Sequence, residues 1–229
     1  MLPVLLALLV VAPPPDTSWP HQDLRERMVQ KQIAARGLTD PAVRGALRSV
    51  PRHRFVPEVS PELAYADRPL PIGHDQTISQ PYIVARMTAL VRPDSADRVL
   101  EVGTGSGYQA AVLASIVDSV YTIEIIPDLA ASATERLRRL GYHNVVVRNG
   151  DGFDGWPARA PFDAIVVTAA PDAIPPPLLD QLAEGGRMSV PVGPAGGPQD
   201  LTLVTNDDGK LTRRTLAPVR FVPFLRPEP

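Results

Sequence analysis

The sequence predicts an α/β fold: a doubly wound, mostly parallel sheet, preceded by N-terminal helices and followed by a β-hairpin. Three features support this expectation. From Arg98 onward, short strands alternate with helical segments, which is typical of a parallel sheet. These strands are almost continuously apolar, as expected when helices cover both faces of a sheet. A glycine-rich turn follows the first strand, where sheets of this kind bind ligands.

Composition and charge are those of a globular protein without thiol or metal chemistry. Of the 229 residues, 44% are hydrophobic and 21% are charged, and the net charge is −2. We expect a single domain over residues 17–229, in which residues 17–92 form a helical addition on the substrate side. The chain has no cysteine, which excludes disulfides and thiolate nucleophiles, and its four scattered histidines predict no metal site. Without a bulk positive charge, binding to nucleic acid is not expected.

Residues 1–16 are predicted to be a separate apolar and proline-rich leader. The apolar run Leu2–Ala12 has 11 residues, whereas a membrane-spanning helix needs about 20, so we expect no stable membrane association. The run has the length of a signal-peptide core, but no Lys or Arg precedes it and three prolines follow it. Two interpretations stay open: an export signal at residues 1–15, or an unstructured or packed leader of a cytoplasmic protein, which we favour.

Three helices are expected before the sheet. The first ends at Gly37, and its apolar face comprises Leu24, Met28, Val29 and Ile33. The second has Asp40 as its N-cap, Pro41 in its first turn and the apolar stripe Val43, Leu47 and Val50, and it ends at Pro51. Residues 52–76 are proline-rich and are expected to be irregular; a loop this long is usually functional or disordered. The third helix opens at Ser79–Pro81 with Ile83, Val84, Met87, Leu90 and Val91 facing inward.

The remainder of the chain supplies the sheet. Strands are expected over residues 99–103, 120–125, 144–147, 163–170 and 187–193, and helices over 108–117, 127–140 and 176–183. Residues 200–205 and 210–219 are expected to form a hairpin around the turn Asn206–Gly209. Residues 219–224 are expected to add one more strand.

Glycines and carboxylates follow successive strands in a pattern that indicates an adenosine ligand. Gly103, Gly105 and Gly107 lie between the first strand and its helix, where free backbone N–H groups can meet an anion. Glu124 ends the second strand, 21 residues after Gly103, at the position where a carboxylate accepts hydrogen bonds from ribose hydroxyls. Asp151-Gly152 follows the third strand at the same edge. The dinucleotide pattern G-x-G-x-x-G would need glycine at Tyr108, which argues against NAD(P), and no Walker lysine follows the loop.

These motifs resemble those of class I S-adenosylmethionine-dependent methyltransferases, which have a Rossmann-like fold. The resemblance implies that Gly103, Gly105 and Ser106 hold the methionine moiety of S-adenosyl-L-methionine and that Glu124 holds the ribose. It also implies that Asp151 and Gly152 border the adenine. Glu101, at the end of the first strand, is added to the predicted cofactor-binding residues.

The segment Pro71–Tyr82, which contains TISQP, closely resembles the signature of protein-L-isoaspartate O-methyltransferases. Further matches lie at residues 99–114, 150–152, 161–170, 184–193 and 219–224, so the resemblance covers residues 22–225. It implies that Ser79 is the catalytic hydroxyl and that Gln76, Thr77, Ile78 and Gln199 lie beside the cofactor. The alternatives are that Ser79 is only a helix cap, that Gln76 and Thr77 are turn residues, and that Gln199 is a polar loop residue.

The resemblance implies a repair enzyme that methylates the α-carboxyl of L-isoaspartyl and D-aspartyl residues in damaged proteins. Its partners would be isoaspartyl-containing peptides and proteins, bound extended across the carboxyl edge of the sheet, and we expect a monomer. An exported enzyme would lack a supply of this cofactor, which favours the cytoplasm. Two alternatives remain: a methyltransferase for another carboxylate or a small molecule, and a non-catalytic module that binds an adenosine ligand.

Overall fold

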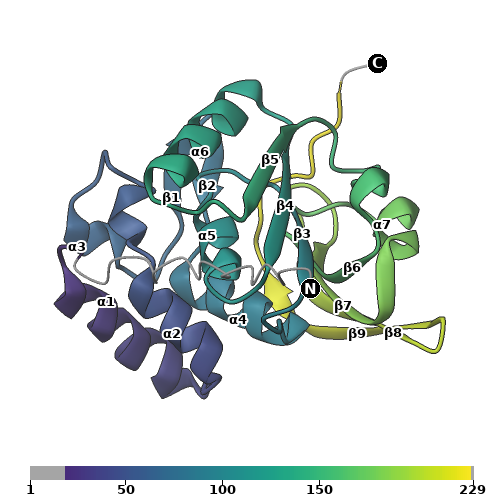
Figure 1. The fold of residues 1–229 in the computed structure, drawn as a ribbon, viewed down its shortest axis with the longest axis horizontal. Helices are drawn as coiled ribbons and strands as arrows, with labels where there is room; N and C mark the ends of the chain where they lie inside the picture. The colour runs from purple at the N-terminus through teal and green to yellow at the C-terminus, as the bar shows by residue number, and fades with distance from the viewer. Residues whose placement is uncertain (1–18, 228–229) are drawn as a thin grey trace, which may run out of the picture.

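A seven-stranded sheet forms the centre of the protein in a computed structural model that describes residues 19–227 (Figure 1). The strand order is β5–β4–β3–β6–β7–β8–β9. The first five of these strands are parallel, and β8 and β9 extend one edge in antiparallel pairing. The bounds are β3 Arg98–Val102, β4 Ser119–Glu124, β5 Val145–Asn149, β6 Phe162–Val167, β7 Leu182–Val192, β8 Gln199–Asp207 and β9 Lys210–Val219. The predicted doubly wound, mostly parallel α/β fold with a hairpin end is confirmed.

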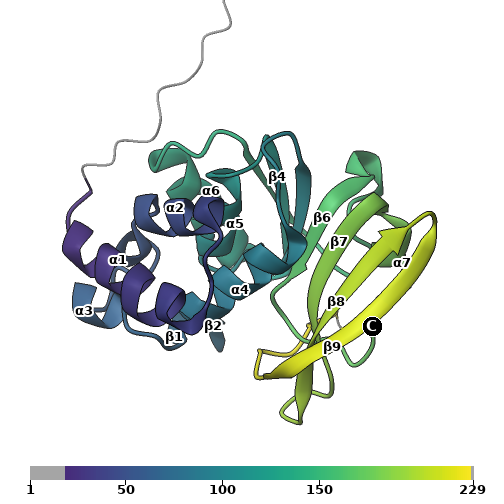
Figure 2. The ribbon, with the colours of Figure 1, turned by 90° about the horizontal axis from the view of Figure 1, so that it is seen from below.

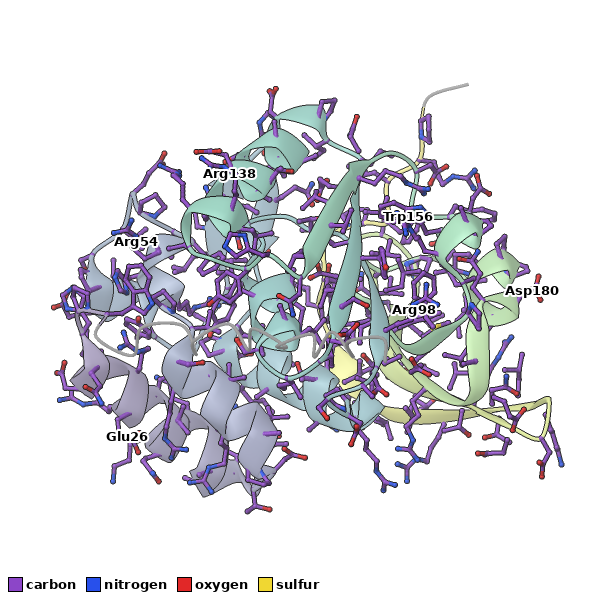
Figure 3. All side chains as sticks on the ribbon, in the orientation of Figure 1. Glu26, Arg54, Arg98, Arg138, Trp156 and Asp180 are labelled. Atoms are coloured by element: carbon purple, nitrogen blue, oxygen red, sulfur yellow. The ribbon has the colours of Figure 1, made fainter. Side chains whose placement is uncertain are left out.

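Helices cover both faces of this sheet because successive strand residues point to opposite sides. On one face lie α4 (Pro81–Val91), α5 (Tyr108–Ala114) and α6 (Pro127–Arg139), in a core that includes Val99 of β3. On the other face, α7 (Pro176–Asp180) packs in a second core that includes the next residue, Leu100. Trp156, labelled in Figure 3, borders this second core and meets the Tyr121 ring edge-on, with 5.6 Å between the ring centroids.

The predicted N-terminal helices lie on the outer side of α4 and α5, away from the sheet (Figure 2). The first is less regular than expected: α1 (Gln22–Met28) continues as the π-helical turn η1 (Val29–Ile33) and the 3₁₀ turn η2 (Ala34–Arg36). It stops at Gly37, whose φ of 85° is a left-handed conformation that favours glycine. The second, α2 (Pro41–Ser49), begins as predicted, because the Asp40 carboxylate accepts a hydrogen bond from the Val43 N–H at 3.0 Å.

Residues 52–76 are more ordered than the predicted irregular stretch. They include the 3₁₀ turn η3 (Arg52–Arg54), the short helix α3 (Pro61–Ala64) and most of a separate antiparallel hairpin, β1 (Leu70–Gly73) with β2 (Gln76–Ile78). The hairpin turn places His74 and Asp75 at φ values of 52° and 55°. A two-residue turn usually signals this conformation with Asn-Gly or Asp-Gly, and their absence made the hairpin unrecognisable in the sequence.

Two predictions near the C-terminus were wrong. Residues 219–224 do not form a strand: β9 ends at Val219, and the following segment makes one isolated bridge within the described residues, between Ala170 and Pro223. Proline has no N–H for ladder pairing, which is one reason why the segment stays outside the sheet. The helix expected over 176–183 is shorter, because β7 already begins at Leu182.

Some expectations about the chain as a whole are not tested. The leader, residues 1–16, lies outside the described residues, and the single domain over residues 17–229 stays a prediction. Within residues 19–227, none of the helices has both the length and the apolar character that crossing a bilayer requires.

Candidate active site

The glycine loop connects β3 to α5 at the carboxyl edge of the sheet. Gly103 has a φ of 98°, and a side chain there would overlap the hydroxyl of Thr168, so both backbone conformation and space require glycine. The N–H of Gly103 donates to the Ile123 carbonyl of β4 at 2.8 Å, which ties the loop to the neighbouring strand. The loop is therefore a fixed surface against which a ligand can lie closely.

Glu124, the predicted ribose ligand, ends β4 directly beside this loop. One carboxylate oxygen accepts the Gly105 N–H at 2.7 Å, and the other accepts the Ile126 N–H at 3.0 Å. Each carboxylate oxygen can accept a second hydrogen bond, so both remain able to receive a hydroxyl group. Glu124 is thus held rigidly and can still bind a diol.

Glu101 is a buried carboxyl with one oxygen left without a partner. Its Oε2 accepts from the Thr122 hydroxyl at 2.5 Å, whereas its Oε1 has no hydrogen-bond partner. Burial raises the pKa of the Glu101 carboxyl to about 8, although the hydrogen bond from Thr122 acts in the opposite direction. The residue lines a small cavity next to Ser79, Ser106 and Gln109, where a cation could pair with its free oxygen.

Asp151 and Gly152 follow β5 at the same edge, as predicted. The Asp151 carboxylate accepts the Phe153 N–H at 2.9 Å and pairs with Arg226 at 2.7 Å, and the Arg226 guanidinium lies 3.8 Å from the centre of the Phe153 ring. The Gly152 backbone lies so close to Val102 that a side chain there would overlap it. Gly152 lines the first cavity described below, and the neighbouring Asp151 binds the C-terminal segment through Arg226.

Gln199, predicted to lie in a loop beside the cofactor, is the first residue of β8 and holds the segment that follows β9. Its side-chain oxygen accepts the Phe221 N–H at 2.6 Å, its amide nitrogen donates to the Phe221 carbonyl at 3.3 Å, and it is buried. With both ends of the amide used, Gln199 acts on the cleft by holding residues 220–225, the yellow trace beyond β9 in Figure 1. The predicted contact between Gln199 and the cofactor stays a prediction.

The TISQP segment lies against the glycine loop although more than twenty residues separate them in the sequence. β2 carries Gln76, Thr77 and Ile78, and Ser79 follows it at the start of α4. The N-cap of α4 is Gln80 and not Ser79, and no side chain makes a capping hydrogen bond there. The alternative that Ser79 serves as a helix cap is therefore wrong, and its hydroxyl has no partner among the described residues.

Three cavities meet at this point. The first is lined by Gln76, Gly103, Gly105, Glu124, Gly152 and the C-terminal residues Val222–Leu225. The second, of about 340 Å³, is lined by Ser79, Gln80, Tyr82 and residues 218–222. The third is the small cavity at Glu101, which also contains Ile78, Ser79 and Ser106. Thr77 and Thr168 line all three cavities, so a ligand in the first can reach a ligand in the second at these two threonines.

The sequence did not single out Thr168 or the residues Val222–Leu225. Thr168 follows β6, and its hydroxyl lies 2.7 Å from the Gly103 carbonyl. Its position at the end of a parallel strand was the signal that could have identified it. Residues 222–225 follow the β8–β9 hairpin, which the turn Asn206–Gly209 did predict, but no local pattern indicates that the segment after β9 lines a cavity. Within residues 19–227, no group of three or more His, Asp or Glu side chains could hold a metal ion.

Known proteins resemble this chain over nearly its whole length. The family model for protein-L-isoaspartate(D-aspartate) O-methyltransferase matches residues 23–228. A protein-L-isoaspartate O-methyltransferase of Opitutus terrae is 55% identical over 98% of this chain and 97% of its own, and that of Gloeobacter violaceus is 56% identical over 88% and 98%.

Solved structures agree with these matches. One protein-L-isoaspartate O-methyltransferase has a TM-score of 0.80 and 31% identity, over 87% of this chain and 65% of its own. A Plasmodium falciparum structure of the same type, in complex with S-adenosyl-L-homocysteine, has a TM-score of 0.75 and 26% identity over 90% and 98%. The chain belongs to the protein-L-isoaspartate(D-aspartate) O-methyltransferase family.

Proposed function

We propose that this protein transfers the methyl group of S-adenosyl-L-methionine to the free carboxylate of damaged aspartyl residues in proteins. That carboxylate is the α-carboxylate of an L-isoaspartyl residue or the side-chain carboxylate of a D-aspartyl residue. The observation that carries this proposal is the meeting of the cavities at Thr77 and Thr168, directly beside the unpartnered hydroxyl of Ser79. A methyl group can pass between two ligands only where their sites touch, and a group that orients the acceptor must stand at that point.

The residues present fit this cofactor. Glu101 offers a buried carboxyl oxygen without a partner, which suits an ammonium group, and Glu124 offers two oxygens that can each accept a hydroxyl. The Gly103 and Gly105 backbone would lie against the amino-acid part together with Ser106 and Ile78. Gln76, Thr77, Asp151 and Gly152 would border the nucleoside. Gln199 would contribute by holding the C-terminal wall.

The bound cofactor supplies an electrophilic methyl group on a positively charged sulfur. The acceptor carboxylate is already ionised at neutral pH, so the protein has no proton to remove. Its task is to align the carboxylate with the methyl group and to keep water from solvating the nucleophile. The Ser79 hydroxyl can donate one hydrogen bond to the carboxylate, which orients the carboxylate without binding it as strongly as a cationic side chain would.

Substitution of Ser79 tests this assignment. Because Gln80 is the helix cap, Ser79→Ala should leave the melting temperature nearly unchanged. It should lower kcat for an isoaspartyl peptide about 10- to 150-fold, as expected when one hydrogen bond to a charged group is lost. Ser79→Thr should retain part of the activity.

Ser60 provides the matched control, because it does cap a helix by accepting the Leu63 N–H. Ser60→Ala should cost about 1 kcal/mol of stability and leave kcat unchanged. A stable Ser79→Ala protein with normal kcat would end the assignment.

The acceptor itself is tested with matched peptides. An isoaspartyl peptide should be methylated and its normal aspartyl isomer should not. Methylation of both peptides alike, or of small carboxylates only, would favour a methyltransferase for another acceptor. Tight cofactor binding without ester formation on any acceptor would favour the non-catalytic module.

We also propose a cellular location and an oligomeric state for this enzyme. The enzyme acts in the cytoplasm, where the cofactor is available, and it acts as a monomer. Fractionation of cells and light scattering of the purified protein test these two statements.

A further inference from the structure

The second cavity has an unusual charge for a protein whose net charge is −2. We call it the acceptor groove; its lining includes Arg36, Arg86 and Arg220 and no carboxylate. Arg36 pairs with Asp67 at 3.0 Å and stacks on the Tyr82 ring, 3.3 Å from its centre, so much of its charge is compensated. Arg86 and Arg220 form no ion pair with any described residue. Two arginines without an ion-pair partner among the described residues therefore line the groove.

The positive charge continues beyond the groove along α4. One turn after Arg86, the Leu90 carbonyl accepts a hydrogen bond from the Arg187 guanidinium at 3.3 Å. Burial lowers the pKa of Arg187, and the neighbouring Arg92 and Arg214 lower it further, whereas Asp207 raises it. Arg187 of β7, Arg214 of β9 and Arg92, which follows α4, thus lie near one another, with Asp207 as a nearby acid.

We propose that the acceptor groove selects damaged sites flanked by acidic residues. This inference rests on the proposed function and names the substrate class of that site. A polypeptide that places its reacting carboxylate at Ser79 must extend past both arginines. Arg86 lies five residues after Pro81, about 7.5 Å along the helix, which corresponds to roughly two residues of extended peptide. Asp or Glu side chains one to three residues from the reacting site would reach guanidinium groups, which bind carboxylates in a two-pronged geometry.

Three isoaspartyl peptides of equal length test this inference, with Glu, Gln or Lys two residues to either side of the reacting site. At low salt, kcat/KM should fall in the order Glu, Gln, Lys, with about a 5- to 20-fold difference between the Glu and Lys peptides, as expected for a few exposed ion pairs. The difference should shrink at about 0.5 M salt, because exposed charges are screened. Equal values for the Glu and Lys peptides, or a preference for Lys, would overturn the inference.

Charge reversal separates an electrostatic role from a structural one. The variant Arg86→Glu/Arg220→Glu should invert the order so that the Lys peptide becomes the better substrate, and Arg86→Gln/Arg220→Gln should remove the preference. Arg138→Gln, on α6 and outside the groove lining, is the matched control and should keep the wild-type order (Figure 3). An unchanged preference in the reversed variant would refute the assignment to these arginines.

Peptide binding, measured by fluorescence anisotropy with S-adenosyl-L-homocysteine present, keeps this inference separate from the proposed function. If no peptide is methylated, the proposed function fails, while tighter binding of the Glu peptide still supports the charge of the groove. Equal binding of all three peptides would refute the inference that the groove selects acidic flanking residues. Tighter binding of a labelled oligonucleotide than of the Glu peptide, lost in the same reversed variant, would assign the arginines to nucleic acid and also refute it.

Discussion

The buried carboxyl of Glu101 should make the stability of the cofactor-free protein depend on pH. The folded protein holds this proton up to pH of about 8, whereas the unfolded chain releases it near 4.5. A raised pKa in the folded state means that stability is greatest below pH 4.5 and is lost as the pH rises towards 8. pH 7 lies about 2.5 units above the pKa of this carboxyl in the unfolded chain and still below its pKa in the folded protein. At 1.36 kcal/mol per unit, the stability lost by pH 7 is about 3 kcal/mol. Glu101→Gln keeps the shape and the neutral state, and should remove this loss.

The assay compares thermal unfolding of wild type and Glu101→Gln between pH 5 and pH 8.5. Between pH 5 and pH 8.5 the same two pKa values give a loss of about 4 kcal/mol. For a chain of this size this corresponds to roughly 8–16 °C in melting temperature, so the two curves should diverge by that amount as the pH rises. Any hydrogen bond that glutamine gains or loses gives an offset that does not depend on pH. Glu58→Gln, in an exposed position, is the control and should run parallel to wild type. Parallel curves for Glu101→Gln and wild type would refute the assignment of a buried neutral carboxyl.

Three further predictions concern the cofactor cleft and the leader. Glu124→Ala should weaken cofactor affinity by about 1.5–3 kcal/mol, and unchanged affinity in calorimetry would contradict the ribose assignment. Arg226→Ala removes a half-exposed ion pair to Asp151 and should speed dissociation of S-adenosyl-L-homocysteine about 2- to 5-fold in stopped-flow measurements; an unchanged rate would show that the pair does not hold the C-terminal wall. Removal of residues 1–15 should leave kcat/KM unchanged, because they bring no polar chemistry; a large loss in a folded truncated protein would reverse this prediction.

Local sequence patterns determined the strand and helix alternation and the cofactor edge. Val99 and Leu100, adjacent in β3, pack in the two separate cores, as the nearly continuous apolar strands predicted. Gly105 and Glu124 lie together because parallel strands bring their carboxyl ends to one edge, so spacing along the chain was sufficient to place them.

Contacts between distant segments could be decided only by the tertiary structure. The sequence left a helix-capping role for Ser79 open, and the structure assigns the N-cap of α4 to Gln80. Gln199 reaches residue 221 through the β8–β9 hairpin, and Arg86 and Arg220, which are far apart in the sequence, line one groove. The turn Asn206–Gly209 predicted the β8–β9 hairpin itself, but no local pattern predicts which segments line the cavities, because that depends on how whole elements pack. Sequence patterns report the local conformation of the backbone, and the meeting of the cavities at Thr77 and Thr168 is set by long-range packing.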